Sequence, residues 1–315
     1  NGLESLIFTV SQNGPSPILW YVHPTEALEG FDPAIKSSLA NIGENLIVSN
    51  GTKVYVLNAL TGEVVNKIDL PEGMYVERLI SDDAGNLLAS VDVAEGDLVI
   101  YKVDINTLAA EPFITYATNN LWVNTAGNIR VSGDITKNAE IVATAHGGYF
   151  LVWHVVDGVP STWYYGNTPY YAWSVQDCCT APAGPSIEDG LYFIAYGSDY
   201  NLYYLNTFTS NSEANSWALA FETGSDGNED FNSIDVAEFK GTQYVGIVAS
   251  SHFTYSDSNI WVLDATDKTA LKPVLDIPCE DFITRDANWA NVHLTDGGPY
   301  SDIILVPTES ALVVA

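Results

Sequence analysis

Seven aromatic residues are the side chains of this sequence best suited to hold a ligand. They occur in or beside segments rich in asparagine, glycine, serine and threonine, such as TNNLWVNTAGN at 118–128 and GNTPYYAW at 166–173. Sugar rings stack their apolar C–H faces on aromatic rings, while amides and carboxylates bond to the hydroxyl groups. The candidate residues for a glycan site are Trp122, Tyr170, Tyr171, Trp173, Tyr200, Tyr255 and Trp289.

Two further sets of residues are candidates for metal binding. Imidazoles from separate segments can share one metal ion, and the set here is His146, His252 and His293. The segment TGSDGNEDF at 223–231 places Asp226, Asn228 and Asp230 like oxygen ligands of a calcium loop, without the bidentate glutamate of an EF-hand. Neutral, hydrogen-bonded histidines and a solvated acidic loop are the alternative interpretation. We expect no cofactor, with calcium as the one ion that the acidic loop would suit.

Motifs for catalysis are absent from the sequence. It contains no GxSxG, no HExxH and no phosphate-binding glycine loop. A glycosidase needs two carboxylates at a set separation, and no motif marks such a pair among the 40 acidic residues. We therefore expect a binding module rather than an enzyme. A carbohydrate-active hydrolase or lyase with axial carboxylates or histidines is the alternative.

A repeated unit of short apolar runs must position these segments. The stretch 45–70 contains the runs NLIVS, KVYVLN and VVNKIDL, separated by NGT and ALTGE. Asn50-Gly51 predicts a two-residue hairpin turn, and Gly62 supplies the backbone freedom for the second turn. The middle run recurs at intervals of 45 to 58 residues, at 53–58, 98–104, 149–154, 201–206, 259–264 and 311–315.

Four-stranded units of about fifty residues without intervening helices predict an all-β fold, a β-propeller of antiparallel blades. The sixth copy stops at its third strand, because the sequence ends at Ala315. We expect the N-terminal run Leu6–Val10 to supply the missing strand and close the ring. Six blades are favoured. The run Ile18–Val22 either extends that strand or belongs to a seventh blade, and residues 1–315 form one domain.

The segment VYVLNALTGEVVNKIDL at 54–70 resembles the blades of quinoprotein-like and YVTN-type propellers, which are WD40-like repeats. IWVLDATDKTALKPVLDI at 260–277 is a degenerate copy of it. The whole chain also looks like propellers of secreted or surface lipoproteins from gut Bacteroidetes, many of unknown function and near glycan-uptake systems. That resemblance implies a protein outside the cytoplasm whose lipoprotein leader has been removed, and the abrupt start at Asn1-Gly2 agrees with a removed leader. Propellers host enzymes and binding modules alike, so the resemblance implies a fold rather than an activity.

Charge and cysteine content limit the partners. Lys and Arg number 11 against 40 Asp and Glu, a formal charge of -29 that repels nucleic acids and anionic membranes. No apolar run reaches the roughly 18 residues of a membrane helix. Cys178 and Cys179 are adjacent, and we expect two buried thiols rather than a vicinal disulfide. The sequence thus predicts a monomeric, extracellular, non-catalytic module that binds a glycan, with a protein-interaction scaffold as a further alternative.

Overall fold

The computed structural model describes most of the chain, and its strands dominate. The described residues are 5–10, 18–22, 24–32, 35, 37–70, 72, 75–76, 78–90, 97–107, 109–117, 129–145, 149–167, 178–195, 201–205, 217–223, 229–251, 258–278 and 303–315. Within them the helices are a single turn, α1 (Pro24–Ala27), and a 3-10 turn at Ile187–Asp189. No helix in these ranges has the length and apolar character of a membrane span.

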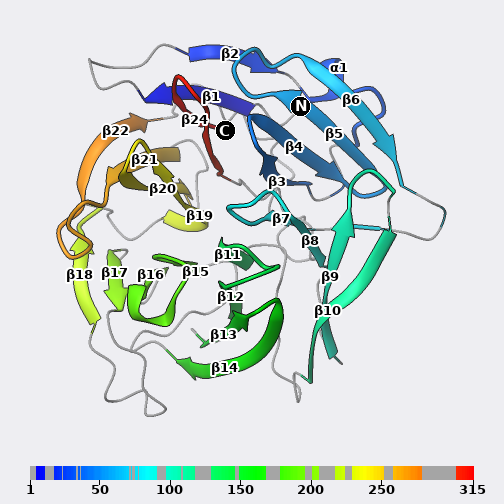
Figure 1. The fold of residues 1–315 in the computed structure, drawn as a ribbon. Helices are drawn as coiled ribbons and strands as arrows, with labels where there is room; N and C mark the ends of the chain where they lie inside the picture. The colour runs from blue at the N-terminus through cyan, green and yellow to red at the C-terminus, as the bar shows by residue number, and fades with distance from the viewer. Residues whose placement is uncertain are drawn as a thin grey trace.

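The described strands form six four-stranded antiparallel sheets arranged around an axis (Figure 1). We name each sheet by its innermost strand, because these strands contact one another in sequence around the axis. Five sheets use consecutive strands, so the predicted all-β propeller with four-stranded antiparallel blades is confirmed. They are β3 (Ser37–Ile42), β4 (Asn45–Asn50), β5 (Lys53–Asn58) and β6 (Val64–Asp69); β7 (Arg78–Ser81), β8 (Leu87–Ser90), β9 (Asp97–Asp104) and β10 (Ala109–Ala117); β11 (Ile129–Gly133), β12 (Ala139–Ala145), β13 (Tyr149–Val156) and β14 (Val159–Asn167); β15 (Cys178–Pro182), β16 (Leu191–Ala195), β17 (Leu202–Leu205) and β18 (Trp217–Phe221); and β19 (Glu229–Phe239), β20 (Thr242–Ser251), β21 (Ser258–Asp264) and β22 (Lys272–Pro278).

The remaining sheet combines both ends of the chain. Its order is β23 (Leu305–Pro307), β24 (Leu312–Val314), β1 (Ser5–Val10) and β2 (Ile18–Val22). Phe8 on β1 is paired with Val314 on β24, which confirms the prediction that the two chain ends share a sheet. The sequence reasoning gave this sheet one N-terminal strand, but the structure gives it two. The run Ile18–Val22 is the outer strand, bonded to β1, and belongs to no separate blade.

A tryptophan fixes this outer strand to the neighbouring β3 sheet. Trp20 Nε1 donates a hydrogen bond of 2.9 Å to the carbonyl oxygen of Ala59. Its ring lies against Gly62, where an added Cβ would overlap the indole. Gly62 also has a φ of 71°, which disfavours other residues. Glycine is therefore required at position 62 for two reasons: the turn predicted from the sequence needs a positive φ, and the ring of Trp20 leaves no room for a Cβ.

The predicted hairpin at Asn50-Gly51 forms, one residue further along. Asn50 pairs with Lys53, so Gly51 and Thr52 make the two-residue loop, and Gly51 has a φ of 62°. This is the positive angle that such loops demand.

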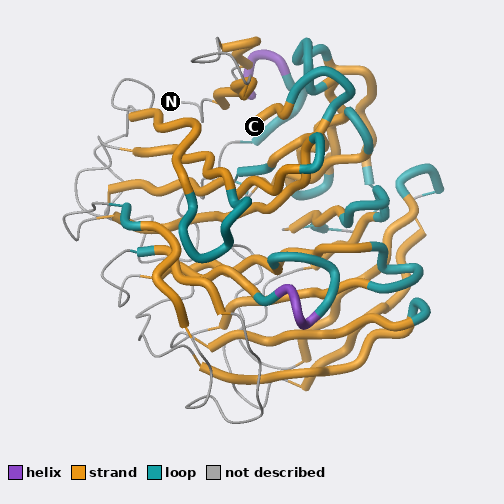
Figure 2. Tube along the Cα trace, turned by 60° about the vertical axis from the view of Figure 1, so that its left-hand side comes forward, coloured by secondary structure: helices purple, strands orange, loops and turns teal. Residues whose placement is uncertain are grey.

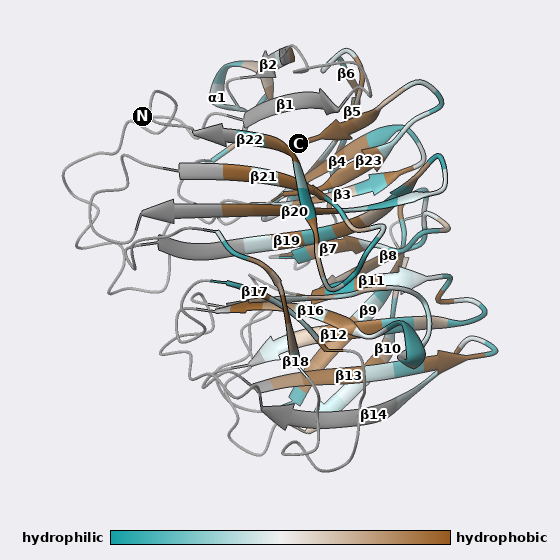
Figure 3. Ribbon diagram, turned by 90° about the vertical axis from the view of Figure 1, so that its left-hand side faces the viewer, coloured by the Kyte–Doolittle hydropathy of each residue, from teal (hydrophilic) through white to brown (hydrophobic). Residues whose placement is uncertain are grey.

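The core lies between the sheets rather than inside them. On β13, Phe150 and Val152 pack towards the β15 sheet, while Leu151 and Trp153 pack towards the β7 sheet. Because successive side chains of a strand point to opposite faces, a strand buried on both faces reads as a continuous apolar run. Trp153 meets Tyr116 edge to face with ring centroids 5.8 Å apart. In Figure 3 the hydrophobic colour follows the strands, and the hydrophilic colour gathers at the hairpins.

Candidate functional site

A cavity of about 560 Å³ lies among the inner strands at the axis of the ring. Its volume falls within the range of about 300–1,000 Å³ typical of ligand sites. Gly43, Gly85 and Pro185 of the hairpins between first and second strands contribute to its wall, so it lies towards that face of the ring. Figure 2 shows most of the described loops on one face. The polar residues on the wall include Asn41, Ser81, Asp83, Ser132, Glu238 and Gln243.

Arg130 crosses the axis beside this cavity. It lies on β11 and is only 5% exposed. Its Nε donates to the carbonyl oxygen of Ile234 at 2.5 Å, and its Nη2 donates to Ser233 Oγ at 2.6 Å and to the carbonyl oxygen of Ile303 at 3.2 Å. Ser233 and Ile234 lie on β19, and Ile303 comes two residues before β23 in the sheet that combines both ends of the chain, which we call the composite sheet. One guanidinium thus connects three sheets, two of which are not neighbours of its own strand in the ring.

Asp235 balances the charge of this arginine. Its Oδ1 lies 3.6 Å from Arg130 Nε, and its Oδ2 accepts a hydrogen bond of 2.7 Å from the backbone N–H of Leu305. A buried guanidinium needs such a partner, because an uncompensated charge in the interior is strongly unfavourable. The charge and the donors of Arg130 are therefore engaged by the protein itself, which makes the cavity a poor site for an anion.

Asp83 carries negative charge at the mouth of the cavity. Its Oδ2 accepts hydrogen bonds from the backbone N–H of Gly133 at 2.6 Å and from Ser132 Oγ at 3.2 Å. Desolvation raises the pKa of this carboxyl, and the charges of Asp82 and Glu238 raise it further, against the effect of the two hydrogen bonds. The repulsion shows that several carboxylates converge on one small space.

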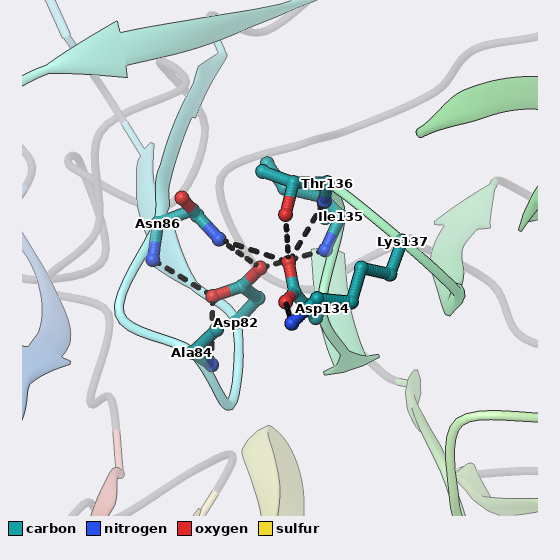
Figure 4. Close-up of polar contacts among 7 residues, drawn as sticks. All are labelled: Asp82, Ala84, Asn86, Asp134, Ile135, Thr136 and Lys137. Atoms are coloured by element: carbon teal, nitrogen blue, oxygen red, sulfur yellow. Dashed lines mark hydrogen bonds and ion pairs between the residues drawn. The ribbon is translucent and has the colours of Figure 1, made fainter. Parts of the chain in front are cut away.

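The neighbouring Asp82 stabilises the wall rather than facing a ligand (Figure 4). It is 4% exposed, and its Oδ1 accepts from the backbone N–H groups of Ala84 at 3.0 Å and Asn86 at 2.7 Å. Its Oδ2 accepts from Asn86 Nδ2 and from the backbone N–H of Ile135, both at 2.8 Å. Aspartate starts turns by bonding the backbone two residues on, and here it also holds the turn of the next sheet.

Asp134 holds the hairpin turn on the β11 side of the contact between the β7 and β11 sheets. Its Oδ1 accepts from Thr136 Oγ1 at 2.6 Å and from Asn86 Nδ2 at 3.4 Å, and its Oδ2 lies 2.7 Å from Lys137 Nζ. The hydrogen bond from Lys137, followed by those from Thr136, holds the pKa of this carboxyl well below its usual range. Asp82 and Asp134 together fix two adjacent hairpins, and with them the position of Asp83.

The residues predicted from the sequence as a site lie almost entirely outside the described residues. This holds for the seven aromatic candidates, for the three histidines, and for Asp226 and Asn228. Asp230 lies in β19, paired with Ser250, but its side chain is outside the described part. Those predictions stay predictions. In the described ranges, no three His, Cys, Asp or Glu side chains gather as a metal site would require.

The cysteine prediction is resolved at one of the two adjacent positions. Cys179 is a fully buried free thiol, so it forms no vicinal disulfide with Cys178. Burial raises the pKa of this thiol far above its ordinary value, although the charge of Arg130 opposes the shift. A thiol of this kind is unreactive, because the thiolate is the nucleophilic form.

Sequence reasoning missed Arg130, Asp235 and Asp83 as members of one site. A signal was present, since the chain has only three arginines, and two of them, Arg78 and Arg130, lie buried on inner strands. Arginine is rare in this chain, so an arginine within a short apolar run indicates that its charge is paired inside the protein. Their partners could not be found in the same way, because Arg130 and Ile303 are 173 positions apart.

Two comparisons with known sequences bear on the family. The model of a family described as "Domain of unknown function (DUF8500)" matches residues 28–314. No curated protein sequence matches the chain.

Solved structures with a similar fold include three propellers with TM-scores above 0.5. A TolB-like protein of Agrobacterium tumefaciens has a TM-score of 0.53 and 12% identity over 88% of this chain and 90% of that chain. A DUF4623 family protein of Bacteroides eggerthii has a TM-score of 0.53 and 14% identity over 89% and 70%. A protein of unknown function from Bacteroides thetaiotaomicron has a TM-score of 0.52 and 9% identity over 99% and 76%. At these identities the likeness shows the fold alone.

Proposed function

The chain belongs to the family of the domain of unknown function DUF8500, and on that premise we propose that it is a non-catalytic binding module on a six-bladed ring. Five sheets of consecutive strands and one composite sheet support this blade count. The composite sheet hydrogen-bonds the first described strand to the last one, so no long edge is left between the chain ends. Such a ring is a rigid frame for loops, which is what a recognition module needs.

The ligand in this proposal is a glycan, bound on the face opposite the axial cavity. The support is topological. The outer strand β10 ends at Ala117 and the next inner strand β11 begins at Ile129, so the intervening segment with Trp122 joins two sheets at the start of an inner strand. The axial cavity lies towards the other ends of these strands.

The second-to-third connections start from the same face. In an antiparallel sheet the second strand runs back along the first, so it ends where the first began. The strand β16 ends at Ala195 and β17 begins at Leu202, and the segment between them contains Tyr200. The equivalent segment between Ser251 and Ser258 contains Tyr255. The described strand ends that flank these segments lie on one face of the sheets, and this arrangement is the observation that carries the proposal.

Affinity electrophoresis in gels that contain a soluble polysaccharide tests this function. We expect retardation of the wild-type protein by at least one polysaccharide and its loss in Trp173→Ala and Trp289→Ala. Val159→Ala is the matched control, because Val159 is 67% exposed on a third-to-fourth hairpin at the other face. Absence of retardation on every polysaccharide, with the variants unchanged, would refute glycan binding and favour a protein partner.

A location outside the cytoplasm is part of the same proposal. The charge of -29 and the scarcity of lysine and arginine support it, together with the resemblance to secreted and surface propellers. Fractionation of the producing cell, with detection by an antibody against the ring, tests it. Recovery in the cytoplasmic fraction alone would contradict the location and leave the binding function to be judged separately.

A further inference from the structure

We infer that the axial cavity is a second binding site and that it takes an organic cation, a primary ammonium group on a slender alkyl chain. Four carboxylates line this cavity, those of Asp82, Asp83, Asp235 and Glu238, against the single guanidinium of Arg130. The site lies on the face opposite the proposed glycan site. Either site can therefore fail a test without affecting the other.

Three of the five charged groups are already engaged by the protein. Asp82 accepts four hydrogen bonds from the two hairpins that it joins. Asp235 and Arg130 bind each other and the backbone of the composite sheet. Asp83 accepts two hydrogen bonds from neutral groups, Gly133 N–H and Ser132 Oγ, so its negative charge and that of Glu238 remain for a ligand.

Asp83 and Glu238 come from the β7 and β19 sheets, which are not neighbours in the ring. Their charges nevertheless interact, because Glu238 contributes to the raised pKa of Asp83. Glu238 is exposed, and its carboxylate makes no hydrogen bond or ion pair with any residue in the described ranges. A cation placed between two such carboxylates would remove their repulsion and gain both attractions.

One neutral residue of the wall, Gln243, offers an open acceptor. The side-chain oxygen of Gln243 is buried and accepts no hydrogen bond from the described residues, while its Nε2 donates to the carbonyl oxygen of Ala183 at 3.0 Å. A buried acceptor without a donor is unfavourable and rare in folded proteins. An ammonium group has three donors and no acceptor, which complements this wall.

The size of the cavity argues for an organic cation over a metal ion. The residues that the structure describes contain no group of three metal-ligating side chains, here or elsewhere. A volume of about 560 Å³ is far greater than an ion requires and accommodates an alkyl chain. The chain would lie along Ile80, Val131 and Ile304, which are apolar residues of the same wall.

Calorimetric titration with spermidine at low salt tests the inference. We expect saturable binding that weakens as salt is added, and no binding of a neutral diol of similar length. The double variant Asp83→Asn, Glu238→Gln should lose affinity by about tenfold or more, since two charge pairs are removed. Glu63→Gln removes one charge from an exposed turn of the β3 sheet and should bind within about twofold of wild type. Spermidine binding that is absent, or equal in the double variant and wild type, would overturn the proposal.

A second measurement guards against misfolding of the double variant. In wild-type protein, carboxyl NMR should show the pKa of Asp83 fall when spermidine is added, because a nearby cation favours the charged form. An unchanged pKa at saturating spermidine would overturn the placement of the ammonium. Repeating the titration with a short lysine-containing peptide distinguishes a free amine from a lysine of a protein partner. Competition between peptide and spermidine would support one shared site.

Discussion

Two buried carboxylates on either side of the β11 sheet have opposite surroundings. Asp82, at the contact between the β7 and β11 sheets, accepts four hydrogen bonds. Glu140, on the side of the β11 sheet that faces the β15 sheet, is fully buried, and neither of its oxygens has a partner among the described residues. Burial is thus equal, but only one of the two groups is compensated.

The consequence for Glu140 is a neutral carboxyl. Desolvation, together with the negative charges of Asp189 and Glu188, raises its pKa to about 9, although Lys268 opposes the shift. A hairpin turn supplies backbone donors to an acid, whereas in the middle of a strand the backbone N–H groups are already bonded to the neighbouring strands. Glu140 lies in β12 between Ser132 and His154 of the flanking strands.

The largest effect is expected from removing the guanidinium that pairs with Asp235, because Glu140 has no such partner among the described residues. Arg130→Met removes the guanidinium beside Asp235, and the backbone carbonyls of Ile129, Ile234 and Ile303 lose a donor. We expect a loss of roughly 4 kcal/mol in the free energy of unfolding, measured by urea denaturation. Arg130→Lys, which keeps the charge but not the planar fork, should recover only part of it. Equal stability of Arg130→Met and wild type would contradict the internal role of this residue.

A smaller effect is expected from removing the compensated acid itself. Asp82→Ala leaves the N–H groups of Ala84, Asn86 and Ile135 without their acceptor, and we expect a loss of roughly 2–3 kcal/mol. Urea denaturation and amide exchange at Ile135 measure it. Lys137→Met is the control, because Lys137 is 77% exposed and should leave the unfolding midpoint unchanged. Unaltered protection of Ile135 in Asp82→Ala would show that the two hairpins are held by other contacts.

The smallest effect, counted per pH unit, is expected from the ionisation of Glu140. Its folded pKa of about 9 lies above the ordinary value of 4.5, so between these values the folded state binds the extra proton. Stability contributed by that proton is complete below pH 4.5 and is lost as pH rises towards 9. Relative to Glu140→Gln, wild type should lose up to about 1.4 kcal/mol per pH unit in this window. Unfolding curves at pH 5, 6, 7 and 8 check this, and parallel pH profiles for both proteins would show that Glu140 titrates normally.

The repeated runs predicted much of the fold. The run KVYVLN at 53–58 forms β5 with the predicted bounds, and the run VVNKIDL forms β6, which ends one residue earlier. These predictions succeeded because strand period and turn residues are local properties of the chain. The place of Ile18–Val22 was left open between two alternatives, because nothing local in this run tells which strand it will pair with.

The candidate site was far less predictable. The aromatic and histidine candidates lie outside the described residues, so the glycan and metal hypotheses stand as predictions. An axial site with carboxylates was named only as an alternative, and the residues of the axial cavity were not identified, because they come from separate sheets and carry no shared motif. In the sequence, Asp83 and Glu238 are only two of 40 acidic residues.

By itself, the sequence determined the unit: short strands buried on both faces, separated by turns in which Gly51 and Gly62 take positive φ angles. Those features depend on neighbours a few residues away, where side-chain alternation and backbone sterics act. Only the tertiary structure decided which charges meet at the axis, such as Arg130 with Asp235 and the carbonyl of Ile303. The arrangement of the sheets around the axis brings these groups together, and the weak dielectric screening of the interior makes the difference between a compensated acid such as Asp82 and an uncompensated one such as Glu140 large.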